Sequence, residues 1–240
     1  MTFNRIWLLF TSMQTELMLV ALLGGVAALD NTEAFQTMLS QPLLVSAVVG
    51  FCLSDLAGGL RMGVLLQLVY LWVMPIGTAN FPDPSVGSVV GCASYVMLNR
   101  LFPDRPHLAL LLVFFFTIPF CQFCGWSLIQ QRRANLALLP KADAYAETAD
   151  TRGFSRLFLG ALSLSFLRGV ALSALGTVCA YLLLGTLMQA LSRIPDARLP
   201  NLETAVWGWG IGTMIYQFGR KQDWPWSLCG LTLGVILLLT

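Results

Sequence analysis

The sequence predicts an all-α integral membrane protein, a multi-span helical bundle with broken or re-entrant helices. Of its 240 residues, 57% are hydrophobic and only 11% are charged, and the mean hydropathy is +0.73. A soluble domain carries roughly a quarter charged residues, and a soluble core at this length has no room for so much apolar surface. Several uncharged runs approach the roughly 20 residues that cross a bilayer as a helix, and residues 106–131 and 169–192 are the clearest two.

Apolar segments follow one another along the whole chain, and several are too short for a straight span. The first is expected to be a retained helix rather than a cleaved signal sequence, because Gln14, Thr15 and Glu16 interrupt the apolar run before it. The run from Pro42 to Ser54 is shorter than one crossing of the hydrocarbon layer, which predicts a half-span or a re-entrant hairpin. The expected apolar segments are about 17–29, 42–54, 56–76, 84–102, 106–128, 154–191, 204–219 and 224–240.

One polytopic membrane domain, residues 1–240, is the expected organisation. Residues 1–128 form an N-terminal part with the broken hairpins, 129–156 a cytoplasmic segment, and 157–240 the C-terminal helices. The middle segment is placed in the cytoplasm because it carries an excess of basic residues beside membrane ends. Its content of Ala, Leu, Lys and Glu predicts a short surface helix. The basic residues are Arg132, Arg133, Lys141, Arg152 and Arg156.

Two carboxylates interrupt apolar sequence and are candidate functional residues. Asp55 stands in "VGFCLSDLAGGLRMG", and Asp83 stands in "ANFPDP", where Asn80 is the other strongly polar side chain. An ionised carboxylate inside a bilayer is costly unless it is paired or faces water, so such residues mark functional sites. For Asp55, a surface turn with Arg61 as a nearby counter-charge is an equally good interpretation. Two prolines constrain the segment that contains Asn80 and Asp83, which favours a functional break there.

A further polar group, Gln67, lies in the middle of the apolar segment "LLQLVYLW". An amide at this position needs a partner, and it suits a hydrogen bond between helices as well as a neutral polyhydroxylated ligand. Tyr70 and Trp72 follow closely. Aromatic rings stack on the apolar faces of sugars, but they also belong to interface belts and helix packing, so these two residues alone do not discriminate.

The cysteines and the single histidine predict no metal, cofactor or catalytic centre. All six cysteines lie in apolar surroundings and are expected to be small buried hydrophobes, including the pair Cys121 and Cys124. His107 stands at the start of an apolar helix, and the chain has neither the HExxH motif of a metalloprotease nor the GxSxG motif of a serine hydrolase. An intramembrane enzyme is therefore disfavoured, and no cofactor is expected.

The stretch "QPLLVSAVVGFCLSDLAGGLRMGVLLQLVYLWVMPIGTANFPDP" resembles the membrane-embedded IIC subunit of the mannose, fructose and sorbose family of the bacterial phosphoenolpyruvate-dependent sugar phosphotransferase system. The family pattern has an RPL-like start, a VG pair, a GD turn, a glycine-rich helix with a central Glu or Gln, a PIG or NIG break, and a PD pair. Weaker likeness continues in "RRANLALLPKADAYAE" and "LSRIPDARLPNLETAVWGWGIGTMIYQF". The matching positions are Gln41–Leu43, Val49 and Gly50, Ser54 and Asp55, Gly58–Gly63, Gln67, Pro75–Gly77, and Pro82 with Asp83.

This resemblance implies a sugar-translocating, multi-pass permease subunit of the bacterial inner membrane. The implied partners are a IID-type membrane subunit in an oligomeric assembly, soluble IIA and IIB phosphocarrier proteins that phosphorylate the incoming hexose-class sugar, and membrane lipid, but no nucleic acid. No phosphoryl-transfer residue is implied in this chain itself. The broken segments would alternate the exposure of a site near the midplane by moving as a rigid body. The implied substrate-binding residues are Asp55, Gln67, Asn80 and Asp83, with Trp72 or Tyr70 stacking on the sugar.

Three departures from the mannose-type pattern lie inside this stretch. Ser54 replaces the glycine of the GD turn, Gln67 replaces a glutamate, and Pro75 replaces an asparagine. An amide in place of a carboxylate changes which hydroxyls the site holds, so mannose is not assumed as the substrate. Three alternatives stay open: a diverged regulatory member without transport, a structural scaffold, and an unrelated small-solute permease subunit such as that of a vitamin importer.

Overall fold

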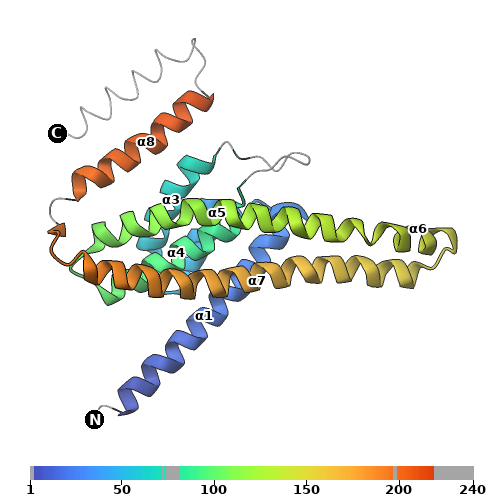
Figure 1. Cartoon of the computed structure of the whole chain (residues 1–240), viewed down its shortest axis with the longest axis horizontal. Helices are drawn as coiled ribbons and strands as arrows, with labels where there is room; N and C mark the ends of the chain where they lie inside the picture. Colours follow the sequence, from blue (N-terminus) through green and yellow to red (C-terminus); the bar gives the residue numbers. More distant parts are fainter. Residues whose placement is uncertain (1–2, 72, 74–81, 197–198, 219–240) are drawn as a thin grey trace.

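The structure is a computed structural model that describes residues 3–71, 73, 82–196 and 199–218. All regular secondary structure in these residues is helical, which confirms the predicted all-α class (Figure 1). The predicted segment 224–240 lies outside the described residues. The helices are α1 (Phe3–Thr32), α2 (Pro42–Cys52), α3 (Leu56–Tyr70), α4 (Pro84–Leu101), α5 (Pro106–Leu136), α6 (Leu139–Glu147), α7 (Thr151–Ala190) and α8 (Pro200–Phe218).

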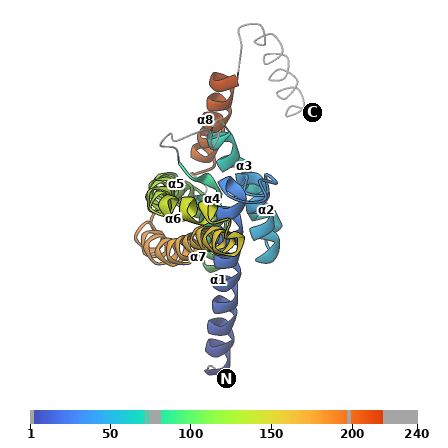
Figure 2. The same cartoon turned by 90° about the vertical axis from the view of Figure 1, so that its right-hand side faces the viewer.

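Long apolar helices form the body of the protein. The helices α5 and α7 run side by side and are joined through α6, while α1 crosses α7 (Figure 1, Figure 2). The 40 residues of α7 correspond to about 60 Å, which is roughly twice the thickness of the hydrocarbon core. Within the described residues, the stretches long and apolar enough to span a bilayer are Met13–Asn31, Pro106–Glu147 and Thr151–Ala190.

The segments that the sequence predicts to be short are short in the structure. Helix α2 has 11 residues and α3 has 15, and the two form a hairpin. At the turn between them, Ser54 has a φ of 59°, in the left-handed region. This conformation favours glycine, which explains why the related pattern has a glycine at this position.

Glycines allow the two arms of this hairpin to touch. A Cβ atom at Gly59 would lie 2.6 Å from the carbonyl oxygen of Ser46 and 2.8 Å from the Cα atom of Gly50. Close approach of backbones through small residues is how helices associate where water provides no hydrophobic driving force. The close approach of Gly50 and Gly59 therefore sets the hairpin geometry. It also sets the positions of the α3 side chains, including Gln67.

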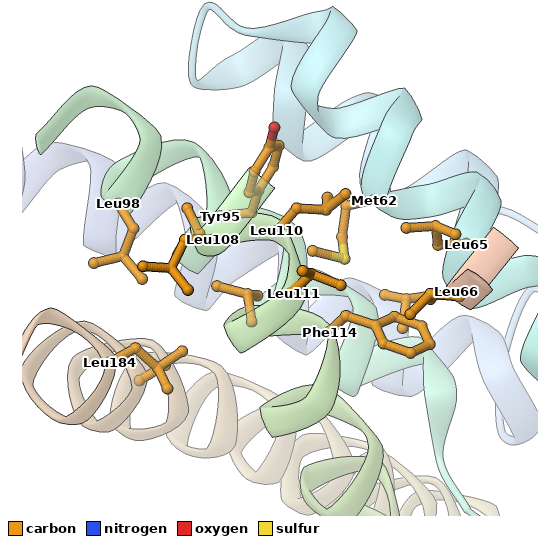
Figure 3. Packing of buried hydrophobic residues seen from close by; sticks show 14 of the residues in the cluster. Met62, Leu65, Leu66, Tyr95, Leu98, Leu108, Leu110, Leu111, Phe114 and Leu184 are labelled. Atoms are coloured by element: carbon orange, nitrogen blue, oxygen red, sulfur yellow. The ribbon is translucent and has the colours of Figure 1, made fainter. Parts of the chain in front are cut away.

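A hydrophobic core between α3, α4, α5 and α7 supports the hairpin from one side. Large apolar side chains from α3 and α5 interlock there, and Leu184 of α7 closes the cluster below them (Figure 3). Because lipid tails are as apolar as these side chains, close packing rather than exclusion of water holds the cluster together. Other labelled members are Met62, Leu65, Leu66, Tyr95, Leu98, Leu108, Leu110, Leu111 and Phe114.

The polar segment 129–156 is mostly helical, because it contains the end of α5, the whole of α6 and the start of α7. Every residue of α6 is described and none is buried. This confirms the predicted short surface helix. The cytoplasmic position of the segment stays a prediction.

Gly59→Ala is expected to lower the melting temperature of the purified protein in detergent. The added methyl group meets backbone atoms of α2 that cannot move aside, and such overpacking costs about 1–3 kcal/mol. Gly160→Ala is the matched control, since a Cβ atom there meets nothing within 4 Å, and its stability should stay within about 1 kcal/mol of the wild-type value. Equal melting temperatures for the two variants would show that the hairpin contact does not constrain the fold.

Candidate functional site

A small polar cavity lies where the broken elements meet. It forms between the α1–α2 connection, the end of α3 and the start of α4, and its volume is about 20 Å³. A cavity of this size has room for about one water molecule. Its lining residues are Asn31, Ser40, Gln41, Pro42, Val73, Pro84 and Ser85.

Asp83 lies beside this cavity and caps the start of α4. The Asp83 side chain is fully buried, and its Oδ1 atom accepts hydrogen bonds from the Ser85 amide at 3.2 Å and from Asn31 Nδ2 at 3.1 Å. Its Oδ2 atom pairs with Arg168 Nη2 of α7 at 3.3 Å. The Arg168 side chain is itself only 8% exposed. A carboxylate that is buried in this way is stable because a charged partner and hydrogen-bond donors surround it.

Gln67 stabilises the start of α2, next to the lining residue Gln41. Its Oε1 atom accepts a hydrogen bond from the Leu43 amide at 3.2 Å, and its Nε2 atom donates to Gln41 Oε1 at 3.3 Å. The Leu43 amide belongs to the first turn of α2, where backbone donors have no partner within the helix. The Gln67 side chain therefore caps the start of α2. The expectation that an amide at this position needs a partner is confirmed.

The cavity lies close to the middle of the bundle. The amide of Asp83 donates to the carbonyl oxygen of Cys121 at 2.9 Å. Cys121 is at the midpoint of α5, two residues after Pro119, which lies inside that helix. This contact places Asp83 beside the middle of one of the helices long enough to span a bilayer.

The structure brings together some of the predicted site residues and separates others. Gln67 and Asp83 do not line the cavity themselves but hydrogen-bond to residues that do, Gln67 to Gln41 and Asp83 to Asn31 and Ser85. The hydroxyl of the buried Tyr70 donates instead to the Ile118 carbonyl oxygen at 3.3 Å. Asp55 is at the far end of the hairpin, where its side chain caps α3 by accepting from the Gly58 amide at 2.8 Å. It is not among the described residues that line the cavity. Trp72 and Asn80 lie outside the described residues.

Several residues at this site were not singled out in the sequence. They come from connections and helix starts, where polar residues are ordinary and carry no local signal. Arg168 did carry a signal, because it is a cation in the middle of a long apolar helix, 12 residues beyond Arg156. The residues added by the structure are Asn31, Ser40, Gln41, Ser85 and Arg168.

A second charged cluster, here called the α8 junction, consists of Arg61, His107, Glu203 and Trp207. The Glu203 carboxylate, only 8% exposed, pairs with Arg61 Nη2 at 2.5 Å and with His107 Nδ1 at 2.5 Å, and it accepts from Trp207 Nε1 at 3.2 Å. The proposed pairing of Arg61 with Asp55 is therefore wrong, because Arg61 points from α3 to α8. His107 is at the start of α5, as predicted.

The cysteines fit their predicted packing role only in part. Cys92, Cys121 and Cys124 are buried, but Cys52 and Cys179 are exposed on outward helix faces, and the five described cysteines form no disulfide. An outward face in a bilayer is apolar too, so apolar sequence does not separate it from the core. The described residues contain no group of three or more His, Cys, Asp or Glu placed to hold a metal ion.

Comparison with known proteins identifies similar sequences and a similar structure. The model of the family described as "PTS system sorbose-specific iic component" matches residues 14–240. The sorbose-specific EIIC component of Klebsiella pneumoniae is 25% identical over 205 residues, which cover 84% of this chain and 73% of that protein. The fructose permease IIC component of Bacillus subtilis (strain 168) is 25% identical over 189 residues, or 78% of this chain and 64% of that protein.

The structural comparison supports the fold. A chain in the structure of the mannose transporter ManYZ in complex with microcin E492 superposes with a TM-score of 0.60. The two chains are 19% identical, and the match covers 94% of this chain and 92% of the other. The likeness shows a shared helical membrane architecture.

Arg168→Met is expected to destabilise the purified protein by about 3–5 kcal/mol, because it leaves the buried Asp83 carboxylate without a counter-charge. Adding Asp83→Asn should recover most of the loss, since a neutral asparagine still caps α4. Thermal denaturation in detergent measures both variants. If the double variant is no more stable than Arg168→Met alone, the pairing of these two charges is not what stabilises the break.

Proposed function

The chain belongs to the sorbose-specific IIC component family of the bacterial sugar phosphotransferase system, and on this premise we propose that its polar cavity is where the transported sugar binds. It is a IIC permease of the mannose family, a multi-span protein of the bacterial plasma membrane that couples sugar uptake to phosphorylation. Members of this family work with IID and IIAB components. This family membership removes the alternative of an unrelated permease.

The proposal rests on one observation. Two helices that begin after a break in the helical chain, α2 and α4, start at the same polar cavity. The first turns of α2 and α4 both border it, through Pro42 and through Pro84 with Ser85. Transporters of other folds use the ends of broken helices at mid-depth to contact their substrates. The cavity lining supplies amides and hydroxyls, which are the groups that hydrogen-bond to sugar hydroxyls.

The cavity must widen before a hexose fits, since it holds about one water molecule. The hydrogen bonds from Gln67 to Leu43 and Gln41 join α3 to the start of α2. The hairpin is therefore suited to move as one body against α4, which carries Asp83. Such a movement changes the size of the cavity without breaking either arm of the hairpin.

The charges at the site favour a neutral sugar. The Asp83 carboxylate is already compensated by Arg168 and Asn31, and Gln67 contributes a neutral amide. A cationic amino sugar would find no free carboxylate among the described lining residues. Two similar proteins are named for sorbose and fructose, both of which are neutral, so these are the first sugars to test.

Phosphorylation is assigned to the partners rather than to this chain. The single histidine, His107, is bound to Glu203 and Arg61 in the α8 junction. A IID-type subunit and soluble IIA and IIB proteins would complete the system. Co-purification of a IID-type protein in detergent would support this assembly.

Gln67→Ala and Ser85→Ala are expected to weaken sugar binding, each by up to about tenfold, because each removes a hydrogen-bonding group worth about 0.5–1.5 kcal/mol. The measurements are equilibrium binding of radiolabelled fructose and sorbose to the purified complex, and uptake by cells that express the chain with its partner subunits.

Asp55→Asn is the matched control for these variants. Asparagine caps a helix as well as aspartate does, so binding and uptake should stay at wild-type levels. A loss of sugar binding in this variant would show that Asp55 takes part in the substrate site. If Gln67→Ala and Asp83→Ala leave both uptake and binding unchanged, the proposed cavity is not the sugar site.

A further inference from the structure

Beyond the cavity, a second set of buried polar side chains lies between α5 and α7. Gln131 Nε2 donates to Glu33 Oε1 at 2.9 Å and to the hydroxyl of Ser165, and that hydroxyl donates to Glu33 Oε2. Gln131 and Ser165 are buried, and Glu33 is partly buried. A carboxylate, an amide and a hydroxyl in one place form a set of donors and acceptors that hydroxylated ligands use.

Along α7, this set lies next to Arg168, which pairs with Asp83 beside the cavity. Arg168, which pairs with Asp83, is one helical turn from Ser165, and its Nη1 atom donates to the Cys124 carbonyl oxygen of α5 at 3.3 Å. Asn135 follows Gln131 by one turn of α5. We call Glu33, Gln131, Asn135, Ser165 and Arg168 the polar seam.

Buried atoms of the seam have unused hydrogen-bonding capacity. Within the described part of the chain, Gln131 Oε1, Asn135 Oδ1 and Arg168 Nε are buried without a hydrogen-bond partner. Each such group costs about 1–3 kcal/mol unless something binds it. In membrane proteins, polar side chains that face the bundle interior mark the paths of substrates and ions.

The seam ends at a groove beside α6. Asn135 belongs to both, and Ala161 of the groove accepts a hydrogen bond from the Ser165 hydroxyl at 3.3 Å through its carbonyl oxygen. The groove has a volume of about 230 Å³ and lies at the end of the bundle where α6 joins α5 to α7 (Figure 1). Its lining residues are Asn135, Leu138, Leu139, Ala142, Phe154, Leu157, Phe158 and Ala161.

We propose that the polar seam is the inward exit route of the sugar, from the cavity near Asp83 to the groove beside α6. The sugar exchanges hydrogen bonds with Ser165, Gln131 and Asn135 in turn, and it leaves where Phe154 and Phe158 line the groove. In the present structure the contacts among Glu33, Gln131 and Ser165 close the route. The inference rests on the proposed function, because it takes the cavity as the place from which the sugar departs.

Cysteine accessibility tests the route directly. Ser165→Cys is compared with Ser163→Cys, whose parent serine is exposed on the same helix and bonds only to its own turn, through the Leu159 carbonyl oxygen. The parent protein carries Cys52→Ala and Cys179→Ala, and labelling is counted as the excess over this parent. The complete membrane complex, in vesicles of each orientation, is treated with a charged, membrane-impermeant maleimide.

Ser165→Cys should be labelled from the face on which α6 lies, and saturating fructose or sorbose should slow this labelling several-fold. The sugars should leave any labelling of Ser163→Cys unchanged. Labelling of Ser165→Cys that neither sugar slows would mean that water alone enters the seam, which overturns the sugar route. Absence of labelling from either face overturns it as well.

A second measurement separates the route from the site. Gln131→Leu should lower the uptake rate by about tenfold, since it removes the central hydrogen-bonding group of the route, while the Kd of the purified complex for the sugar stays unchanged. Gln130→Leu, on the neighbouring position, should alter neither. A parallel loss of binding and uptake in Gln131→Leu would make this residue structural and contradict the route. If the cavity is not the sugar site, the Kd for the sugar stays unchanged in Gln67→Ala and Ser85→Ala. This outcome is distinct from the result that contradicts the route.

Discussion

The buried ion pair between Asp83 and Arg168 is the interaction on which the centre of the protein depends. Asp83 ends a break in the chain, caps α4 and contacts α5 through its backbone, so its position fixes three elements at once. Its charge is tolerable at zero exposure only because Arg168 reaches it from α7. The long helix α7 thus acts as the support for a polar site that the short helices form.

Side chains satisfy the starts of α2, α3, α4 and α5, and this explains how short helices persist in an apolar setting. Water is scarce at membrane depth, so each free backbone amide needs a partner within the protein. Gln67 provides one for α2, Asp55 for α3 and Asp83 for α4. Asp196, from the connection that precedes α8, accepts from the Leu108 amide at the start of α5 at 2.9 Å. The carboxylates and amides that look out of place in the sequence are the residues that make the breaks possible.

Local pattern predicted the helical class, the short elements and the need of Gln67 and Asp83 for polar partners, because interruptions of an apolar run are visible in a few residues. It did not predict the partners of those residues. Arg168 is 85 positions from Asp83, and Glu203 is 142 positions from Arg61. No local spacing encodes such pairs, so the sequence offers only the nearby Asp55 as a partner for Arg61, in one of two equally good interpretations of Asp55. The exposure of Cys52 and Cys179 was missed for a related reason, since a membrane-facing side and a core-facing side have the same composition.

The two ends of the bundle differ in how completely their polar groups are paired, and this difference would give the proposed sugar route its direction. At the α8 junction, Glu203 meets Arg61, His107 and Trp207, and no described atom of this cluster is buried without a partner. At the polar seam, three buried atoms are unpartnered. Opening the bundle at the α8 junction would break a paired charge, whereas opening the outer part of the seam, at Glu33, Gln131 and Ser165, breaks hydrogen bonds but none of the ion pairs of the described residues, and it exposes atoms that gain partners. The seam is therefore the end that yields more readily to a hydroxylated substrate, and it leads toward α6, beside the basic segment expected to lie in the cytoplasm.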